Sequence, residues 1–174
     1  EPDAPDRGAV QTAAPAVPPL RWKPPPTWTL LPPEHGTPRK AVYKTPKAGD
    51  AKAEAEVEVD FFGTGAPGDV EKTFGAWRAQ FDAGDAGAPV RAPLEGARFP
   101  AETIEAAGKY AVAIGPQMGR AKKSAMQMVR EHYRLLGAVV KTPDRGNWFF
   151  KMTGPEDSVQ AARSAFLAMV RAAE

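Results

Sequence analysis

Residues 132–171 constrain the fold more than any other stretch, because they carry the signals of two strands and a helix in immediate succession. In the first of these, His132 to Lys141, apolar residues fill both alternating faces between Leu135 and Val140. Side chains of a strand point alternately to opposite sides of a sheet, so this pattern predicts a central strand that is covered on both sides. A turn at Pro143 to Asn147 and the aromatic run Trp148 to Thr153 predict its hairpin partner.

The hairpin leads into a predicted helix from Pro155 to about Arg171. Proline fits the first helical position, and the carboxylates of Glu156 and Asp157 face the positive end of the helix dipole. Five apolar residues then recur at helical spacing: Val159, Ala162, Phe166, Met169 and Val170. We expect this stripe to pack against the sheet, with Arg163 and Ser164 turned away from it.

A second amphipathic helix is predicted from about Asp69 to Phe81. Its apolar residues follow a helical repeat: Val70, Phe74, Trp77 and Phe81. Gly75 lies inside this helix, where we expect it to permit a close approach to the sheet at some cost in helix propensity. The preceding loop, Phe62 to Gly68, is rich in glycine but lacks the lysine and the spacing of a phosphate-binding loop.

Carboxylates alternate with apolar residues from Ala53 to Phe62, which predicts a strand with one acidic face. The acidic face holds Glu54, Glu56, Glu58 and Asp60. These carboxylates extend over about 20 Å of chain, whereas a calcium site needs oxygens that converge on one centre, so we interpret the row as a solvated face. A strand is also predicted at Arg39 to Thr45. If the two strands pair, Lys44 lies near Glu54. Lys40 then lies near Glu58, and both lysines relieve the acidic row.

The middle of the chain has weaker patterns. Asp82 to Gly96 is rich in glycine, alanine, aspartate and proline, which predicts a surface loop. Ala101 to Ala107 fits either a short helix or a strand, and a turn at Gly108 to Tyr110 favours two strands in succession. Residues 115–128 are expected to form an irregular or partly helical connection.

Charge and composition exclude several classes of protein. The formal net charge of +2 is too weak to indicate nucleic-acid binding, even though the sequence pI is about 8.9. The chain has no cysteine and therefore no disulfide, no thiolate nucleophile and no cysteine-based metal site. No apolar run approaches the roughly 18 residues of a transmembrane segment.

Residues 1–19 are rich in proline and alanine, which predicts a flexible linker ahead of a single α/β domain at residues 20–174. Because the chain begins with Glu1 rather than Met, we expect that an upstream segment has been removed. A tether between an upstream lipid anchor and the folded domain would have this composition. A frayed terminus or an expression remnant would have it too.

Two surfaces are candidates for contact with a partner. Trp22 and Trp28 flank three consecutive prolines, and we favour packing on the core over a proline-rich ligand for a partner's aromatic groove. The other surface is a basic connection that carries Arg120, Lys122 and Lys123. We favour a solvated loop there over a phosphate-binding patch.

Four motifs together resemble a known group of proteins. They are Trp22-Lys23 with Trp28, the segment Trp77 to Phe81, the run Leu136 to Val140, and the end motif Trp148 to Pro155. Over about residues 20–172 the chain resembles an uncharacterised family of exported bacterial proteins and lipoproteins. The element order is also similar to the PsbP-like α/β/α sandwich of extrinsic photosystem II proteins and a Ran-binding nuclear import factor. The resemblance implies an antiparallel sheet covered by helices and an accessory binding role, and it transfers no catalytic residues.

We therefore expect an α+β domain with a mainly antiparallel sheet, exported to the periplasm or the cell surface. Its expected function is non-catalytic binding of an unknown protein or cell-envelope partner, without a cofactor, metal or nucleic acid. The alternative is a small metal-dependent or other hydrolase whose site is not visible in the sequence. The two histidines, His35 and His132, are interpreted as structural rather than catalytic.

Overall fold

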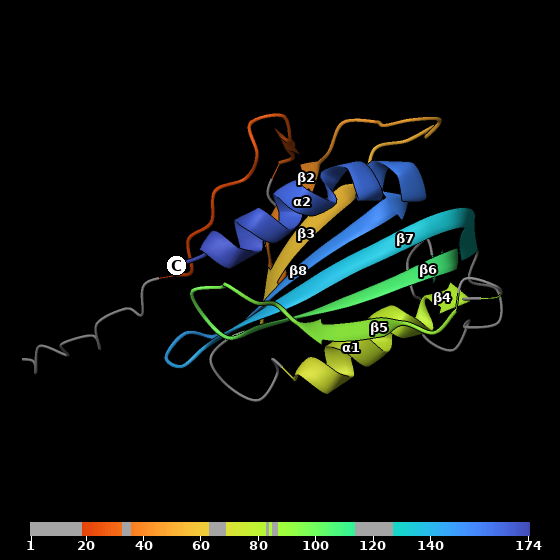
Figure 1. Cartoon of the computed structure of the whole chain (residues 1–174). Helices are drawn as coiled ribbons and strands as arrows, with labels where there is room; N and C mark the ends of the chain where they lie inside the picture. Colours follow the sequence, from red (N-terminus) through yellow and green to blue (C-terminus); the bar gives the residue numbers. More distant parts are fainter. Residues whose placement is uncertain (1–18, 33–35, 63–68, 83, 85–86, 114–126) are drawn as a thin grey trace, which may run out of the picture.

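The computed structural model describes residues 19–32, 36–62, 69–82, 84, 87–113 and 127–174. These residues form one eight-stranded sheet with a helix on each face (Figure 1). The elements are β1 (Thr29–Leu30), β2 (Arg39–Lys44), β3 (Glu56–Phe61), α1 (Val70–Ala79), β4 (Phe81–Asp82), β5 (Val90–Pro93), β6 (Ala101–Ala113), β7 (Gln127–Thr142), β8 (Gly146–Pro155) and α2 (Glu156–Ala172). The predicted α+β fold with a mainly antiparallel sheet is confirmed. The predicted linker lies outside the described residues apart from Pro19.

The strands follow the order β1-β2-β3-β8-β7-β6-β4, with β5 paired to β6 beside this path, and every pair is antiparallel. The central pair is the predicted hairpin of β7 and β8, with both strands longer than predicted. All six side-chain positions from Leu135 to Val140 are buried or, at Gly137, covered by a neighbour. Burial on both faces confirms the prediction of a covered central strand.

One face of the sheet is covered by α2 (Figure 1). The whole predicted stripe of this helix is buried, and Phe166 at its centre is 0% exposed. The helix begins one residue later than predicted, because Pro155 still pairs with Tyr133 at the end of β8. Pro155 has φ −54° and ψ 142°, so it is the N-cap and not the first helical residue.

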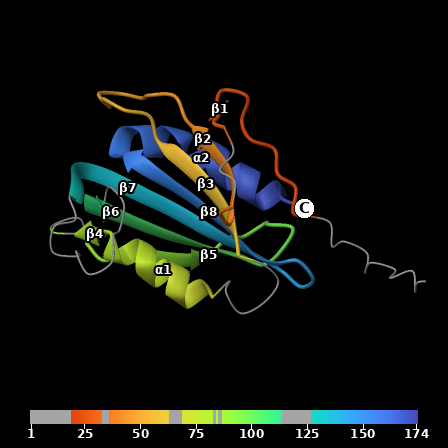
Figure 2. The ribbon, with the colours of Figure 1, turned by 180° about the vertical axis from the view of Figure 1, so that it is seen from behind.

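The opposite face is covered in part by α1, which Asp69 caps by accepting a hydrogen bond of 3.1 Å from the backbone N–H of Lys72. The buried residues beneath α1 come from the helix and from β6, β7 and β8. Figure 2 shows α1 on the side of the sheet opposite α2. The helix ends at Ala79, so Phe81 belongs to β4, contrary to the prediction. Within the described part of the chain, the buried cluster beneath α1 contains no residue of β2 or β3, so α1 does not cover these two strands.

The glycine that allows α1 to approach the sheet is Gly137 and not Gly75. A Cβ atom at Gly137 would lie 2.8 Å from Cε3 of Trp77, so the indole ring occupies the space above this residue of β7. A Cβ atom at Gly75 would meet only the end of the Arg78 side chain, at 3.9 Å. The prediction for Gly75 is therefore wrong, because this residue points away from the sheet.

The pairing of β2 with β3 is antiparallel as predicted but has a different register. Lys44 lies opposite Glu56 and not Glu54. A bulge at Lys40 turns this residue out of the ladder, so Arg39 takes the place next to the acidic row. The paired part of β3 is also shorter than predicted.

Three predictions for the middle of the chain need correction. Four residues of the predicted 82–96 loop form β5, an edge strand. Residues 101–113 form one continuous strand, β6, which decides the open alternative at Ala101 to Ala107 in favour of a strand. Residues 108–110 do not form the predicted turn. A β-bulge in β7 instead places two residues, Glu131 and His132, opposite Lys109 of β6. Most of the predicted connection, residues 114–126, lies outside the described part, and β7 begins at Gln127.

Residues 19–28, which precede β1 and are called the leading segment below, meet the end of α2 at one edge of the α2 layer (Figure 1). Arg21 and Glu174 exchange two backbone hydrogen bonds of 2.7 and 2.9 Å. Within the described ranges, neither helix is long and apolar enough to cross a lipid bilayer.

Candidate functional site

Charged side chains gather on the part of the sheet that α1 leaves uncovered. Glu58 of β3 lies directly opposite Lys151 of β8, and Lys151 lies opposite Gly137 of β7. These residues share one face of the sheet, since directly opposed residues of paired strands project to the same side. The ring of Trp77 fills the space above Gly137 and so closes one side of the position of Lys151.

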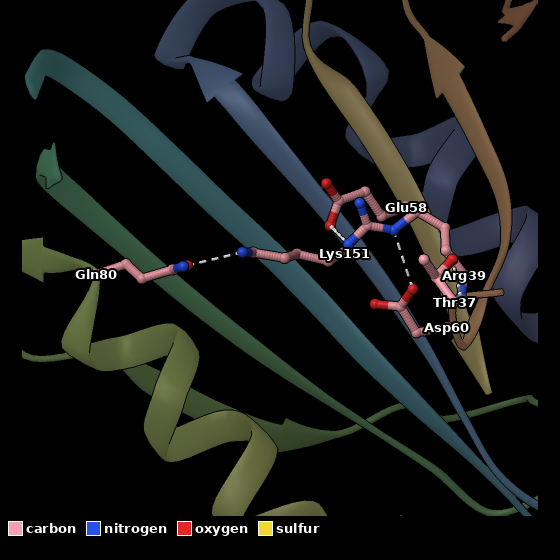
Figure 3. A network of polar contacts seen from close by, with 6 residues as sticks. All are labelled: Thr37, Arg39, Glu58, Asp60, Gln80 and Lys151. Atoms are coloured by element: carbon pink, nitrogen blue, oxygen red, sulfur yellow. Dashed lines mark hydrogen bonds and ion pairs between the residues drawn. The ribbon is translucent and has the colours of Figure 1, made fainter. Parts of the chain in front are cut away.

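Lys151 has a buried side-chain amine with few polar neighbours. The residue is 8% exposed, and its Nζ donates one hydrogen bond of 2.7 Å to Oε1 of Gln80 (Figure 3). Its Nζ lies 5.8 Å from the ring centre of Trp77 and 6.0 Å from that of Tyr110. Among the residues that the structure describes, no carboxylate oxygen lies within 4 Å of this nitrogen. Burial lowers the pKa of Lys151, and the more distant charge of Glu58 only partly opposes this effect.

Glu58 is the buried member of the acidic row. Its side chain is 21% exposed and accepts a hydrogen bond of 3.0 Å from Nη2 of Arg39 (Figure 3). Burial raises the pKa of Glu58 to about 7, although the charges of Arg39 and Lys151 act in the opposite direction. Arg39 also donates from Nε to Asp60 at 3.1 Å. The prediction of a solvated row is therefore wrong for Glu58 and Asp60, because the guanidinium group of Arg39 on β2 binds both carboxylates.

Two tyrosines complete this part of the site. The rings of Tyr110 and Tyr133 stack with centres 5.6 Å apart and planes 13° from parallel. Burial raises the pKa of Tyr110 to about 12. Together with Lys151, they line a cavity of about 220 Å³, whose acidic wall carries Glu54, Glu56 and Glu58.

A second cavity of about 660 Å³ adjoins the first, since Ala53 and Tyr133 line both. The two cavities together are called the corner groove below. Its second part lies between the start of β7 and the N-terminus of α2, and His132 and Asp157 are among its lining residues. Oγ of Ser158 donates a hydrogen bond of 2.8 Å to the carbonyl of Ala53. This bond connects α2 to a residue that lines both cavities.

His132 has a backbone conformation that is uncommon for a residue with a side chain. Its φ angle is 55°, in the left-handed region, and it lies in the bulge opposite Lys109. Such conformations cost about 1–3 kcal/mol and concentrate at functional sites, and bulges often redirect a side chain next to a site. The sequence placed His132 at the edge of a strand, but the left-handed bulge has no signal in the sequence pattern.

The corner groove offers a buried amine, a carboxyl group that titrates near neutral pH and two aromatic faces. Within the described ranges, no group of three or more His, Asp or Glu side chains could hold a metal ion. The described side chains can supply hydrogen bonds, proton transfer at Glu58 and nucleophilic chemistry at Lys151.

The predicted aromatic surface lies on the opposite face of the sheet from Lys151. Trp28 is 9% exposed and packs against Tyr43, with ring centres 6.0 Å apart. Trp22 is half-buried, and its Nε1 donates a hydrogen bond of 3.0 Å to Oη of Tyr43. The ring of Trp22 also contacts Trp148 and Phe150. Both predicted tryptophans therefore pack the leading segment onto the core.

The predicted basic surface with Arg120, Lys122 and Lys123 lies outside the described residues, as does His35. Its role in partner binding stays a prediction.

The residues that matter most in the corner groove were missed from the sequence. Gln80, Tyr110, Tyr133 and Lys151 come from four separate elements or their ends, so no local motif unites them. One signal was present: Lys151 interrupts the otherwise uncharged run Asn147 to Gly154, in the strand predicted to pair with the covered central strand. A lysine inside such a run must be either paired or functional.

No family model matches the chain, and a search of curated proteins finds no match. Among solved structures, the chain is similar to the solution structure of cyanobacterial PsbP (CyanoP) from Synechocystis sp. PCC 6803. The two sequences are 14% identical, the similarity covers 96% of this chain and 99% of that chain, and the TM-score is 0.42. We transfer no residue, partner or activity from this protein. The resemblance to an exported bacterial family stays a prediction.

Proposed function

We propose that this chain is a non-catalytic binding domain and that its ligand site is the corner groove. The observation that supports this most is the environment of Lys151. A buried ammonium group is costly unless it is paired, yet the described contacts of Lys151 provide one neutral amide oxygen. A lysine of this kind at the wall of a cavity is typical of a ligand site, where the ligand supplies the missing acceptor.

The walls of the groove indicate the chemistry of the ligand. An oxygen acceptor would complete the hydrogen bonds of Lys151, and the stacked faces of Tyr110 and Tyr133 would contact a planar or apolar part. Lys44 of the same cavity pairs with Glu56 and leaves Glu54 unbalanced, which disfavours a strongly anionic molecule. We therefore propose a small polar ligand that is neutral or zwitterionic, with room for a larger group in the 660 Å³ cavity.

An NMR titration of the 174-residue chain tests this proposal. The probes are a panel of free amino acids, sugars and small carboxylic acids, each added to isotope-labelled protein. A binder should shift the amide signals of Tyr110, Tyr133 and Lys151. Lys151→Met should abolish binding yet keep the fold, because replacing a buried charge by an apolar side chain of similar volume is often neutral or stabilising.

The matched control is Lys141→Met. Lys141 lies on β7, is 46% exposed and is 3.7 Å from Glu102, so its loss should leave binding unchanged. Binders that shift signals only outside the groove, or that bind Lys151→Met as tightly as the wild type, would contradict the proposal. A panel without any binder would contradict it as well.

Export and a cell-envelope partner remain part of the proposal. The proline-rich composition of residues 1–19 supports a tether, and the basic connection at Arg120, Lys122 and Lys123 is the candidate contact surface. Fractionation of cells that express the natural precursor would test the location. Replacing the three basic residues by alanine should weaken capture of a cross-linked partner, and unchanged capture would remove this surface from the proposal. No observation in the described residues favours the hydrolase alternative.

A further inference from the structure

We infer that Lys151 is a reactive amine that captures a small aldehyde or ketone as an imine. The inference rests on the proposed function, since it takes the corner groove as the ligand site and names a carbonyl as the group that meets Lys151. It goes further by assigning a covalent bond to this residue.

The first argument is the state of the amine. An amine attacks a carbonyl only when it is neutral, and burial without a counter-ion favours the neutral form. Lys151 lies between the rings of Trp77 and Tyr110, and its described polar contact is the amide of Gln80. The lysines in the described part that form ion pairs differ in this respect. Lys44, Lys109 and Lys141 are each 37–51% exposed and lie within 4 Å of a carboxylate.

The second argument is access. Lys151 lines the 220 Å³ cavity, which is large enough for a molecule of a few non-hydrogen atoms. The neighbouring cavity extends the path past Tyr133. A small carbonyl compound can therefore reach the amine, while the surrounding rings limit the water that competes for it.

The third argument is the nearby carboxyl group. Glu58 lies directly opposite Lys151 in the β3–β8 ladder, and opposed residues have Cβ atoms about 4.5–5.5 Å apart. Its pKa of about 7 makes both its protonated and its ionised form available near neutral pH. A group with this property can both donate and accept a proton during the reaction.

The reaction balances without an oxidant or reductant. The lone pair of Nζ forms a bond to the carbonyl carbon, and one of the two protons on the resulting positively charged nitrogen moves to the oxygen, which gives a neutral carbinolamine. Protonated Glu58 then donates a proton to the hydroxyl group, which leaves as water while the C=N bond forms. Ionised Glu58 then recovers the proton of the iminium nitrogen through one bridging water molecule, because the two groups are not in direct contact. The products are one imine and one water molecule.

Reductive trapping tests the inference. The wild-type chain is incubated with propanal and sodium cyanoborohydride near neutral pH, and the modified residues are located by peptide mass spectrometry. Lys151 should be alkylated faster than the exposed Lys141 of the same molecule, since burial lowers the pKa of Lys151 and so raises the fraction of its amine that is neutral. The rate at Lys151 should level off below pH 10.5, the ordinary pKa of a lysine.

Two variants complete the test. Lys151→Met should remove the fast adduct and leave the slow surface labelling unchanged. Glu58→Gln should slow labelling of Lys151 by about tenfold or more, as loss of a general acid does. Equal or faster labelling in this variant would overturn the role of Glu58. Labelling that spreads over exposed lysines while Lys151 stays unmodified would overturn the inference.

The two proposals can fail separately. If non-carbonyl probes shift the signals of the groove but propanal leaves Lys151 unmodified, the covalent step is wrong and the binding proposal stands. If Lys151 is selectively alkylated but no probe binds reversibly, the reactive amine stands and reversible binding is wrong. Propan-1-ol, which lacks the carbonyl, serves as the matched non-reactive probe.

Discussion

The substitution Glu58→Gln should change how the stability of the protein depends on pH. Burial raises the pKa of Glu58 from an ordinary 4.5 to about 7, so the folded protein holds a proton that the unfolded chain has already released. The resulting stabilisation is complete below pH 4.5 and is lost as the pH rises through about 7. The amide that replaces the carboxyl group does not titrate, so the variant should lack this loss.

The size of the effect follows from the shift. One pKa unit corresponds to about 1.4 kcal/mol, so Glu58 accounts for a loss of about 3 kcal/mol in the free energy of unfolding between acidic and mildly alkaline pH. Among the charged groups that face Glu58, Arg39 and Lys151 lower its pKa, whereas Asp60 and Glu56 raise it. The pKa of about 7 includes all four contributions. About 3 kcal/mol is a large part of the 5–15 kcal/mol that stabilises an ordinary domain.

Urea unfolding followed by tryptophan fluorescence provides the assay, with both proteins measured from about pH 4 to about pH 8.5. The difference between wild type and Glu58→Gln should shift by about 3 kcal/mol in favour of the variant over this range. Glu105→Gln is the matched control, because Glu105 is 24% exposed, pairs with Arg163 and is not among the groups that act on Glu58. This control should keep the wild-type pH dependence. A difference between wild type and Glu58→Gln that stays constant with pH would refute the reasoning.

Four further substitutions test the packing. Gly137→Ala should destabilise by about 1–3 kcal/mol in urea melts, because its Cβ has no space beneath the indole ring of Trp77. Gly75→Ala should be neutral or stabilise by up to about 1 kcal/mol. Equal effects of the two substitutions would contradict the assignment of the close approach to Gly137. Phe166→Ala should cost about 3–5 kcal/mol, and a loss below about 1 kcal/mol would show that the side chain does not fill the core. Ser158→Ala should cost about 0.5–1.5 kcal/mol and speed amide exchange around Ala53, because it removes a half-buried hydrogen bond to this carbonyl. Unchanged exchange there would contradict the connection between α2 and the groove.

The parts of the fold that the sequence predicted best are those with the clearest apolar patterns. Leu135 to Val140 and the stripe around Phe166 have patterns that few other arrangements can satisfy. The register of β2 against β3 was wrong by two residues for a definite reason. A slip of two residues keeps every side chain on the same face, so hydrophobic alternation cannot distinguish Lys44 opposite Glu54 from Lys44 opposite Glu56. The bulge at Lys40 has no such pattern either.

The candidate site was far less accessible to sequence reasoning. Lys151, Tyr110 and Tyr133 stand far apart along the chain, and no motif surrounds any of them in its own strand. The burial that shifts the pKa of Glu58 depends on Arg39 folding across it, and this contact follows from the register that could not be predicted. A site that depends on register, on a bulge and on three strands at once cannot be recognised before the strands are placed.

The two backbone hydrogen bonds between Arg21 and Glu174 have a consequence for how the chain could be rewired. Since the two ends of the described region are neighbours, a short linker could join them, and new ends could open in the exposed turn at Asp144. Such a circular permutant would carry its new termini at the end of β7 remote from His132, and so away from both cavities. Fusion partners or surface attachments could then be added there, while the face that holds Lys151 stays open to solution.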